Sequence, residues 1–571
     1  MKIFGLDLSP KESIENYPGI LVPLSQAHRR SAIEISDGTR RPSTIEKSSI
    51  SDAEKGNIPR HPTQEIEKSE ASTAIEDLRA EILAEVDDEQ QGSAYELKSL
   101  VINKAIQDIG MGRYNWELFI LCGLGWFADN LWFQGVGLTL PALSESFGIS
   151  ENHVRYTTCY FFFGLCIGAS FWGVGSDIMG RRLAFNATLL IASIFGTAVG
   201  AAQTWTTVCW LYLFLGFGIG GNIPVDGALF LEFLPNASSQ LLTLLSAWWP
   251  VGQLVGSLLG WAFMGTNFAP DKGWRYFLYA MGCLTFLIYI YRSFFFKFYE
   301  SPKFLLSQGR QSEAVAVIHG IAFRNKTTTW LTEEILNEIG GDLEATAGPT
   351  LTPSQVLRRK LSSFSTKRIG PLFATKKLGL NTALLWFCWI TIGLGYPLFN
   401  SFLPQYLAKG ESASGEPVSI QETYRNYAIA SVTGVPGSLL ACYTVEVAFI
   451  GRKGTMATAT LLSAIFLFLF TSTHSAAYQL AFASILSFFQ NIMYGVLYAY
   501  TPEVFPAPSR GTGTGISSLL NRIGGLCAPV IAANIPVGNP NDPILGSGGL
   551  ILAAFVAMLF LTIETRGRQI L

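Results

Sequence analysis

The sequence predicts an all-α membrane protein with twelve transmembrane helices in two pseudo-symmetric six-helix bundles. Its composition indicates the membrane class, because 49% of the 571 residues are hydrophobic and only 14% are charged, against roughly 25% charged in a soluble domain. Two sets of six apolar runs supply the helices. Two short motifs recur at one fixed offset, which indicates duplicated halves. The net charge of −2 argues against a nucleic-acid partner.

The N-terminal part of the chain is polar. Residues 1–91 are rich in Ser, Glu and Pro, a composition that favours disorder, so we expect a disordered cytosolic tail, with a regulatory role as an alternative. No apolar h-region begins the chain, and a cleavable signal peptide is not expected. Residues 92–115 are expected to form an amphipathic pre-membrane helix, because Leu97, Val101 and Ile109 recur at helical spacing.

The apolar runs approach the ~20 residues that a helix needs to cross a bilayer. Those of the N-terminal bundle, residues 116–299, centre near Asp129, Gly164, Ile194, Gly218, Val255 and Leu284. Those of the C-terminal bundle, residues 378–571, centre near Ile392, Gly437, Ile465, Phe488, Ile523 and Phe555. Residues 300–377 separate the bundles and are dense in Lys and Arg towards their end. The positive-inside rule therefore predicts that this central loop and both termini are cytosolic.

A polar interruption divides the second apolar run from the third. It contains Gly173, Asp177, Gly180, Arg181 and Arg182. The glycines allow the flanking helices to approach closely, and the aspartate can face a helix N-terminus. The two arginines indicate the cytosolic face.

Parts of the first half return in the second. Gly451 lies 271 positions after Gly180, and Glu503 lies 271 positions after Glu232. Because two independent motifs share one offset, we infer an internal duplication, which is typical of membrane transporters.

The pattern G-x-x-x-D-x-x-G-R-R of residues 173–182 resembles the loop signature of the major facilitator superfamily. Residues 300–303 and 564–567 resemble the motifs that close the two halves of sugar-porter-like members. Residues 218–225 resemble the synaptic-vesicle-protein-like and organic-acid symporter subgroup. The resemblance implies transport by alternating access.

The resemblance also implies a gate at the cytosolic ends of the helices, where matching residues of sugar-porter-like members bridge the halves; solvated membrane-proximal charges are the alternative. The candidate gating residues are Gly173, Asp177, Gly180, Arg181, Arg182, Glu232, Glu446, Arg452, Glu503 and Arg510.

Two ionisable residues stand out inside apolar runs, where a charge is costly unless it is paired or hydrated. Asp129 lies eleven residues into the first run, counted from Leu118, and Arg522 lies eleven residues after Gly511. A structural carboxylate hydrogen-bonded to a neighbouring helix is the alternative for Asp129. Both runs are expected to leave the cytosol, so the two groups should lie at similar depth. A buried arginine requires an anionic partner, which could be Asp129, Asp226 or a substrate carboxylate.

Further polar residues of the apolar runs are candidate substrate or coupling residues, although interhelical hydrogen bonds explain such residues equally well. Asp226 has a helix-packing or gating role as an alternative to coupling. The set is Asp226, Gln253, Asn400, Gln490, Asn491, Tyr494 and Tyr498.

These observations predict a proton-coupled secondary transporter of a small organic anion, a carboxylate. A sugar or polyol carrier is one alternative, and a non-transporting membrane receptor or scaffold is another. No nucleotide-binding motif, metal constellation or nucleophile–base pair occurs, so neither an enzyme, a cofactor nor a metal site is expected. We expect a monomer that binds its substrate and a proton, in the plasma membrane rather than an internal one.

Overall fold

The computed structural model describes residues 2–3, 6–7, 12–25, 63–84, 94–235, 240–265, 270–341, 369–408, 410, 418–445, 447, 450–505, 510–535 and 541–565. The chain divides into two compact units. Unit 1 comprises Met1–Trp116, Phe233–Ala237 and Tyr299–Leu351, and unit 2 comprises Glu117–Glu232, Ser238–Phe298 and Thr352–Leu571.

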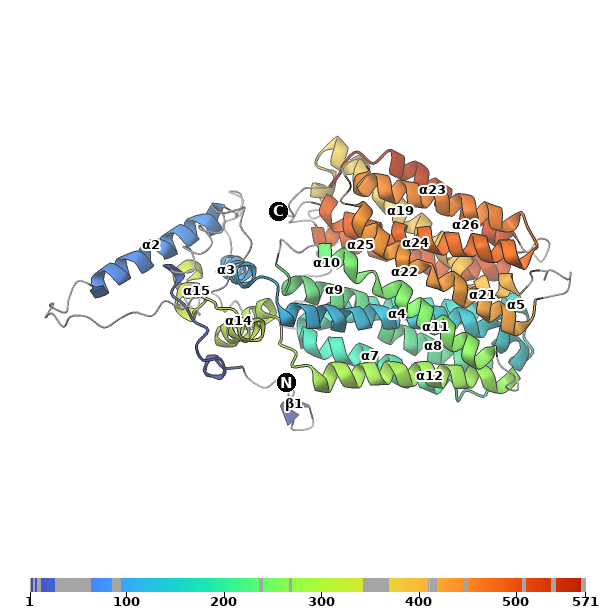
Figure 1. Ribbon diagram of the computed structural model, residues 1–571, viewed down its shortest axis with the longest axis horizontal. Helices are drawn as coiled ribbons and strands as arrows, with labels where there is room; N and C mark the ends of the chain where they lie inside the picture. Colours follow the sequence, from blue (N-terminus) through green and yellow to red (C-terminus); the bar gives the residue numbers. More distant parts are fainter. Residues whose placement is uncertain are drawn as a thin grey trace, which may run out of the picture. The chain divides into compact units, whose positions relative to one another are not determined.

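Six membrane-crossing segments form the N-terminal half of unit 2 (Figure 1). They are α4 (Arg113–Phe147, whose first turn belongs to unit 1), α6 (Tyr156–Met179), α7 (Arg181–Val199), α8 with α9 (Trp205–Ile219 and Asn222–Glu232), α10 with α11 (Gln240–Leu245 and Trp248–Met264), and α12 (Pro270–Ile290). The short α5 (Glu151–Val154) precedes α6, and α12 continues into the π-helical turn η3 (Tyr291–Phe295).

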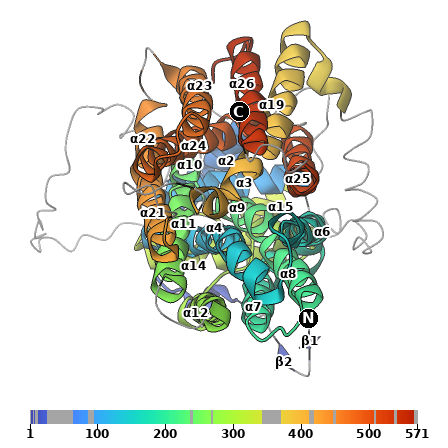
Figure 2. The same ribbon diagram turned by 90° about the vertical axis from the view of Figure 1, so that its right-hand side faces the viewer.

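Six further segments form the C-terminal half. They are α19 (Lys376–Asn400), α21 with α22 (Ile420–Val432 and Gly434–Thr444), α23 (Gly451–Thr471), α24 (Ala476–Val504), α25 (Arg510–Asn534) and α26 (Asp542–Leu559), together with the short η4 (Gly370–Phe373) and α20 (Leu403–Leu407). Figure 2 looks along these helices and shows the two halves beside each other. The predicted fold is confirmed: there are twelve transmembrane helices in two six-helix bundles, and every predicted run centre lies within one of these segments.

Glycines allow α6 and α8 to touch backbone to backbone. A Cβ added at Gly164 would lie 2.0 Å from the carbonyl oxygen of Leu213, and one at Gly216 would lie 2.3 Å from that of Phe161. Only glycine fits such an approach, and close backbone packing is a main source of helix association in lipid. This contact holds α6 and α8 rigidly beside the cavity described below.

The backbone conformation explains why both copies of the loop motif contain a glycine. Gly180 precedes α7 at φ 98°, and Gly451 begins α23 at φ 63°. Residues other than glycine rarely adopt a positive φ, because their Cβ atom clashes with the backbone. The two halves therefore both enter their third helices through a glycine with positive φ.

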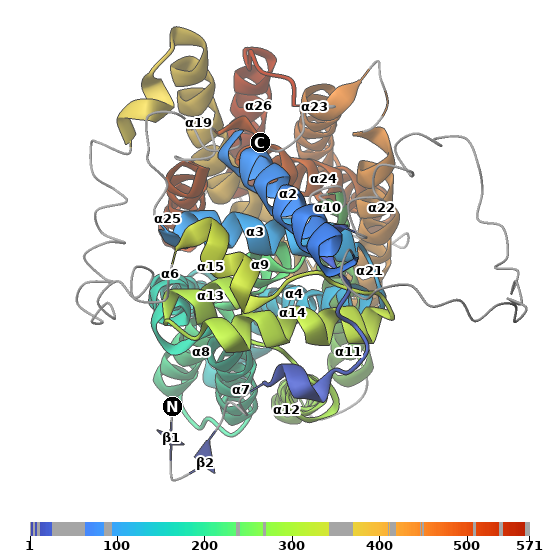
Figure 3. The same cartoon turned by 90° about the vertical axis from the view of Figure 1, so that its left-hand side faces the viewer.

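Unit 1 contains α2 (Thr63–Ala84), α3 (Ala94–Ile109), α13 (Pro302–Ser307), α14 (Gln311–Asn325) and α15 (Glu333–Gly340), the 3-10 turn η1 (Ile14–Asn16), and an antiparallel pair of two-residue strands, β1 (Lys2–Ile3) and β2 (Leu6–Asp7). Helix α3 lies against α13, α14 and α15 (Figure 3). It buries the apolar stripe that contains Val101, Ile102, Ala105 and Ile109. That face is covered by protein within unit 1.

The structure differs from the expected tail where residues 12–25 are described. Tyr17, Ile20 and Leu24 are buried, and the Tyr17 ring packs against Phe323 of α14, with the ring centroids 5.8 Å apart. The peptide N–H of Val22 donates to the carbonyl of Thr329 at 3.0 Å. This segment packs on a surface that lies just over three hundred positions away along the chain, and composition alone does not reveal such a partner.

Candidate functional site

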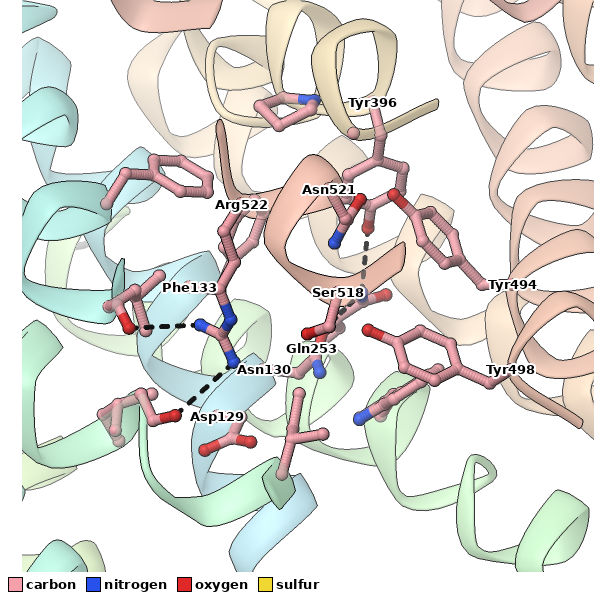
Figure 4. Close-up of a pocket in the computed structure, with 18 of the residues that line it drawn as sticks. Asp129, Asn130, Phe133, Gln253, Tyr396, Tyr494, Tyr498, Ser518, Asn521 and Arg522 are labelled. Atoms are coloured by element: carbon pink, nitrogen blue, oxygen red, sulfur yellow. Dashed lines mark hydrogen bonds between the residues drawn. The ribbon is translucent and has the colours of Figure 1, made fainter. Parts of the chain in front are cut away.

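A cavity lies between the two halves of unit 2 (Figure 4). It encloses about 1010 Å³ of empty space, its open mouth included. Helices α4, α6, α8, α9 and α11 line it from one half, and α19, α24 and α25 from the other. Of the candidate residues, its lining includes Asp129, Gln253, Gln490, Asn491, Tyr494, Tyr498 and Arg522.

Arg522 extends from α25 into this cavity (Figure 4). Its guanidinium donates to the carbonyl oxygens of Leu165 at 3.2 Å and Gly220 at 3.4 Å, both on the opposite half. Among the described residues it forms no ion pair with a carboxylate, and Asp129 acts on it through space rather than by direct contact. Within the described part of the chain, the hydrogen bonds of the guanidinium all go to neutral main-chain carbonyls.

A break in the fourth membrane segment supplies one of those carbonyls. Helix α8 ends at Ile219 and α9 begins at Asn222. Residue 224, which would donate to the carbonyl of Gly220 in a continuous helix, is proline and has no N–H. The Gly220 oxygen is therefore free to accept from Arg522.

Asp129 is 7% exposed and projects from α4. Its Oδ1 accepts a hydrogen bond from Nδ2 of Asn222 at 2.8 Å, whereas Oδ2 has no hydrogen-bond partner. Sequence reasoning missed Asn222, although an amide directly after the Gly220–Gly221 break was a usable signal.

Aromatic rings form one wall of the cavity. Tyr498 lies edge-on to Trp249 and to Trp389, with centroids 4.8 Å apart in both pairs. Tyr396 and Tyr494 form a similar pair at 5.0 Å. Such a wall suits a flat apolar group, because edge-to-face and stacked rings attract one another.

Amide groups supply the remaining polarity. Nε2 of Gln253 donates to the Tyr396 hydroxyl at 3.1 Å, which joins the two halves. Oε1 of Gln490 accepts from Asn400 at 2.9 Å, so Asn400 supports the lining from behind. Nε2 of Gln490 and Nε1 of Trp249 are buried without a partner. Two donors are thus available in or beside the cavity wall.

Asp226 lies outside the cavity lining. Its Oδ1 pairs with Nη2 of Arg292 at 2.5 Å, and both side chains are fully buried. The guanidinium also lies over the Phe185 ring. Arg292 was not identified from the sequence, because an arginine at the end of an apolar run is expected to be a membrane-edge cation.

The candidate gating residues pair within each half. Arg181 binds Glu232 at 2.7 Å, and Arg452 binds Glu503 at 2.7 Å. These four residues occupy equivalent positions in the duplicated halves and define what we call the Glu232 face. Arg182 is half-buried next to Arg181. Glu446 and the side chains of Asp177 and Arg510 lie outside the described residues.

Arg155 joins the halves at the opposite ends of the helices. It is 5% exposed, donates to Oε1 of Gln405 at 3.1 Å and to the carbonyl of Ala532 at 2.7 Å, and lies over the Phe402 ring. We call these four residues the Arg155 face. On the predicted topology this end of the helices is outward, where the positive-inside rule predicts few arginines, and that is the signal that could have identified Arg155.

Comparison with known proteins decides the family. The family model of the Major Facilitator Superfamily matches residues 118–445 and 385–570. The chain belongs to the major facilitator superfamily. It is similar to MFS siderochrome iron transporter 1 of Ceriporiopsis subvermispora, with 42% identity over 486 residues, which is 83% of this chain and 92% of the relative.

Two further likenesses extend this assignment. The niacin transporter NiaP of Acinetobacter baylyi is 26% identical over 468 residues, covering 81% of this chain and 98% of the relative. The xylose transporter XylE from E. coli, in a partially occluded inward open conformation, has a TM-score of 0.58 at 17% identity, covering 80% and 99% of the two chains. The likeness to XylE shows the fold alone.

Proposed function

We propose that this major facilitator transporter carries a small organic anion, a carboxylate with a flat ring, together with a proton by alternating access. The observation that carries the proposal is Arg522, a cation in the cavity whose guanidinium, among the described residues, is hydrogen-bonded to two main-chain carbonyls and to no carboxylate. A carboxylate offers the guanidinium two parallel charge-assisted bonds, which are stronger than bonds to neutral carbonyls. Substrate would therefore replace the bonds to Leu165 and Gly220.

The aromatic wall supports a ring-bearing substrate. A ring bound against Tyr498 and Tyr494, which pack on each other with centroids 6.3 Å apart, would contact the faces and edges that pack best with it. Nε1 of Trp249 and Nε2 of Gln490 could donate to an acceptor on that ring. The name of the niacin transporter is in line with this class, since niacin is a pyridine carboxylic acid.

Asp129 is the proposed proton carrier. An arriving anion places a second negative charge in the same cavity, and like charges disfavour ionisation. Asp129 would then take up a proton, and substrate and proton would cross together. We further propose that the Arg155 face is outward, the Glu232 face and residues 300–377 are cytosolic, and the protein acts as a monomer in the plasma membrane.

The test is uptake into proteoliposomes that hold the purified protein. A panel of aromatic monocarboxylates, aliphatic monocarboxylates and pentoses or hexoses is offered with and without an imposed pH gradient. Arg522→Lys should weaken carboxylate binding about tenfold to a hundredfold, because a point charge replaces the fork. Asp129→Asn should retain counterflow and lose accumulation against a gradient.

Arg275→Lys is the matched control, since Arg275 also binds carbonyls, those of Gly200 and Ala202, but within one half and away from the cavity. Uptake of sugars but not of carboxylates would replace the proposal with the sugar-carrier alternative. If Asp129→Asn still concentrates substrate, the coupling role of Asp129 is wrong.

A further inference from the structure

Helices α4 and α9 meet in a repeated register. Asp129 of α4 contacts Asn222 of α9, and Gly125, one turn earlier on α4, contacts Asp226, one turn later on α9. A Cβ at Gly125 would lie 1.8 Å from Oδ2 of Asp226. The glycine therefore provides the space in which the carboxylate of Asp226 lies. One helical turn, about 5.4 Å of rise, separates the two contacts.

Three buried oxygen atoms at this double contact have no hydrogen-bond partner. They are Oδ2 of Asp129, Oδ1 of Asn222 and Oδ2 of Asp226. Asn222 and Asp226 are fully buried. A buried polar atom without a partner costs about 1–3 kcal/mol, so a second arrangement that satisfies these atoms is within energetic reach.

We propose that Asn222 is a positioning residue that senses whether Asp129 carries a proton and passes this state to the Asp226–Arg292 pair. This inference rests on the proposed function, in which Asp129 takes up the coupling proton. The amide of Asn222 can do this because one end donates and the other accepts. Its orientation therefore depends on what Asp129 presents.

With Asp129 ionised, Nδ2 of Asn222 donates to Oδ1, as the structure has it. When Asp129 is protonated, its hydroxyl becomes a donor, and the free acceptor at hand is Oδ1 of Asn222. The amide then turns over, and its N–H group faces Asp226, four residues later on the same helix. Side chains at this spacing are neighbours on a helix surface. The proton stays on Asp129 throughout.

The consequence falls on Arg292. A second donor on Asp226 would compete with Nη2 of Arg292, which lies in the π-helical turn η3 at the end of α12. Nε and Nη1 of Arg292 have no partner, so Asp226 is its one carboxylate contact among the described residues. A change at Asp129 thereby reaches the end of the sixth membrane segment. The titratable and charged groups that act on Asp129 or Asp226 are Cys122, Arg292, Tyr498 and Arg522, and the two carboxylates also act on each other.

The test replaces Asn222 with a side chain of similar size that neither donates nor accepts. Asn222→Leu should keep counterflow but reduce accumulation driven by a pH gradient at least tenfold. The pH at which uptake is half-maximal should move up by about one unit, because the ionised form of Asp129 loses a charge-assisted hydrogen bond. Asn222→Ser should restore part of the accumulation and part of the wild-type half-maximal pH, since a hydroxyl can donate or accept.

Two further variants separate sensing from folding. Gly125→Ala displaces Asp226 and leaves the hydrogen bond between Asn222 and Asp129 in place, so it should reduce accumulation and move the half-maximal pH less than Asn222→Leu does. Asn186→Leu removes an amide from α7 that does not line the cavity and should change neither. All variants are compared at equal amounts of monodisperse protein.

Separate outcomes would overturn the two proposals. An Asn222→Leu protein with wild-type accumulation and pH profile, beside an Asp129→Asn protein that has lost coupling, ends the sensing role and leaves the proposed function intact. An Asp129→Asn protein that remains coupled ends the proposed function itself. If Asn222→Leu does not fold, Gly125→Ala decides, and normal accumulation by that variant contradicts the relay to Asp226.

Discussion

Replacing Arg155 with leucine should favour a form of the protein in which the two halves are separated at the Arg155 face. The change removes two hydrogen bonds from a charged donor, to Gln405 and to the carbonyl of Ala532, and a contact with the Phe402 ring. A hydrogen bond to a charged group contributes about 1.5–3 kcal/mol, so the loss of both, offset by the desolvation that a buried arginine no longer requires, amounts to about 3 kcal/mol. That is about a hundredfold change in the ratio between the form in which the Arg155 face is closed and the form in which it is open.

The assay is the distance between spin labels attached at positions 151 and 542, both of which are exposed. In the Arg155→Leu protein the longer-distance population should grow about a hundredfold relative to the shorter-distance one. Arg275→Leu is the matched control, because Arg275 also binds two carbonyls and lies over an indole ring, and these contacts lie within one half. An unchanged distance distribution in Arg155→Leu, or an equal change in the control, would refute the closing role of Arg155.

Two predictions concern buried polar groups elsewhere. Asp226→Asn should lower the free energy of unfolding by about 3–5 kcal/mol, because it leaves Arg292 buried without its carboxylate. The double variant Asp226→Asn/Arg292→Met should recover most of that loss. Thermal unfolding in detergent measures both variants, and equal melting temperatures for the two would contradict the pairing. In unit 1, burial and the hydrogen bond from the Tyr17 hydroxyl to Glu12 raise the pKa of Tyr17. The folded state therefore holds this proton more tightly than the unfolded one, so the stabilisation is present below about pH 10 and is lost as the pH rises above it. Protease cleavage within residues 12–25 should increase above pH 10 in the wild type, and a Tyr17→Phe protein that shows the same rise would exclude this cause.

The fold was predictable because each membrane helix can be recognised from its own stretch of sequence. An apolar run of sufficient length has few other structures available in lipid, and the shared offset of Gly180–Gly451 and Glu232–Glu503 revealed the duplication. The break between α8 and α9 was not predicted, although Gly220, Gly221 and Pro224 are the residues that cause it. The packing of residues 12–25 could not be predicted, since it depends on a surface far away in the chain.

The site was partly predictable for a related reason. Asp129 and Arg522 were identified because a charge within an apolar run requires a protein environment, and both line the cavity. Their partners were not predictable. Arg522 reaches Gly220 only because a proline frees that carbonyl, and Asp226 reaches Arg292 only because Gly125 provides space. Such choices depend on helix register and rotamer, which a single sequence does not display.

The charges of Arg522 and Asp129 in one cavity determine how the membrane voltage acts on transport. On the proposed cycle, the empty cavity contains a cationic Arg522 and an anionic Asp129, and the loaded cavity contains Arg522, a substrate anion and a protonated Asp129. Both forms that cross are electrically neutral at the site. Moving one elementary charge through 100 mV involves about 2.3 kcal/mol, and neither form would experience that term. The membrane voltage would then neither drive nor oppose transport, and the proton concentration difference alone would set how far the substrate is concentrated.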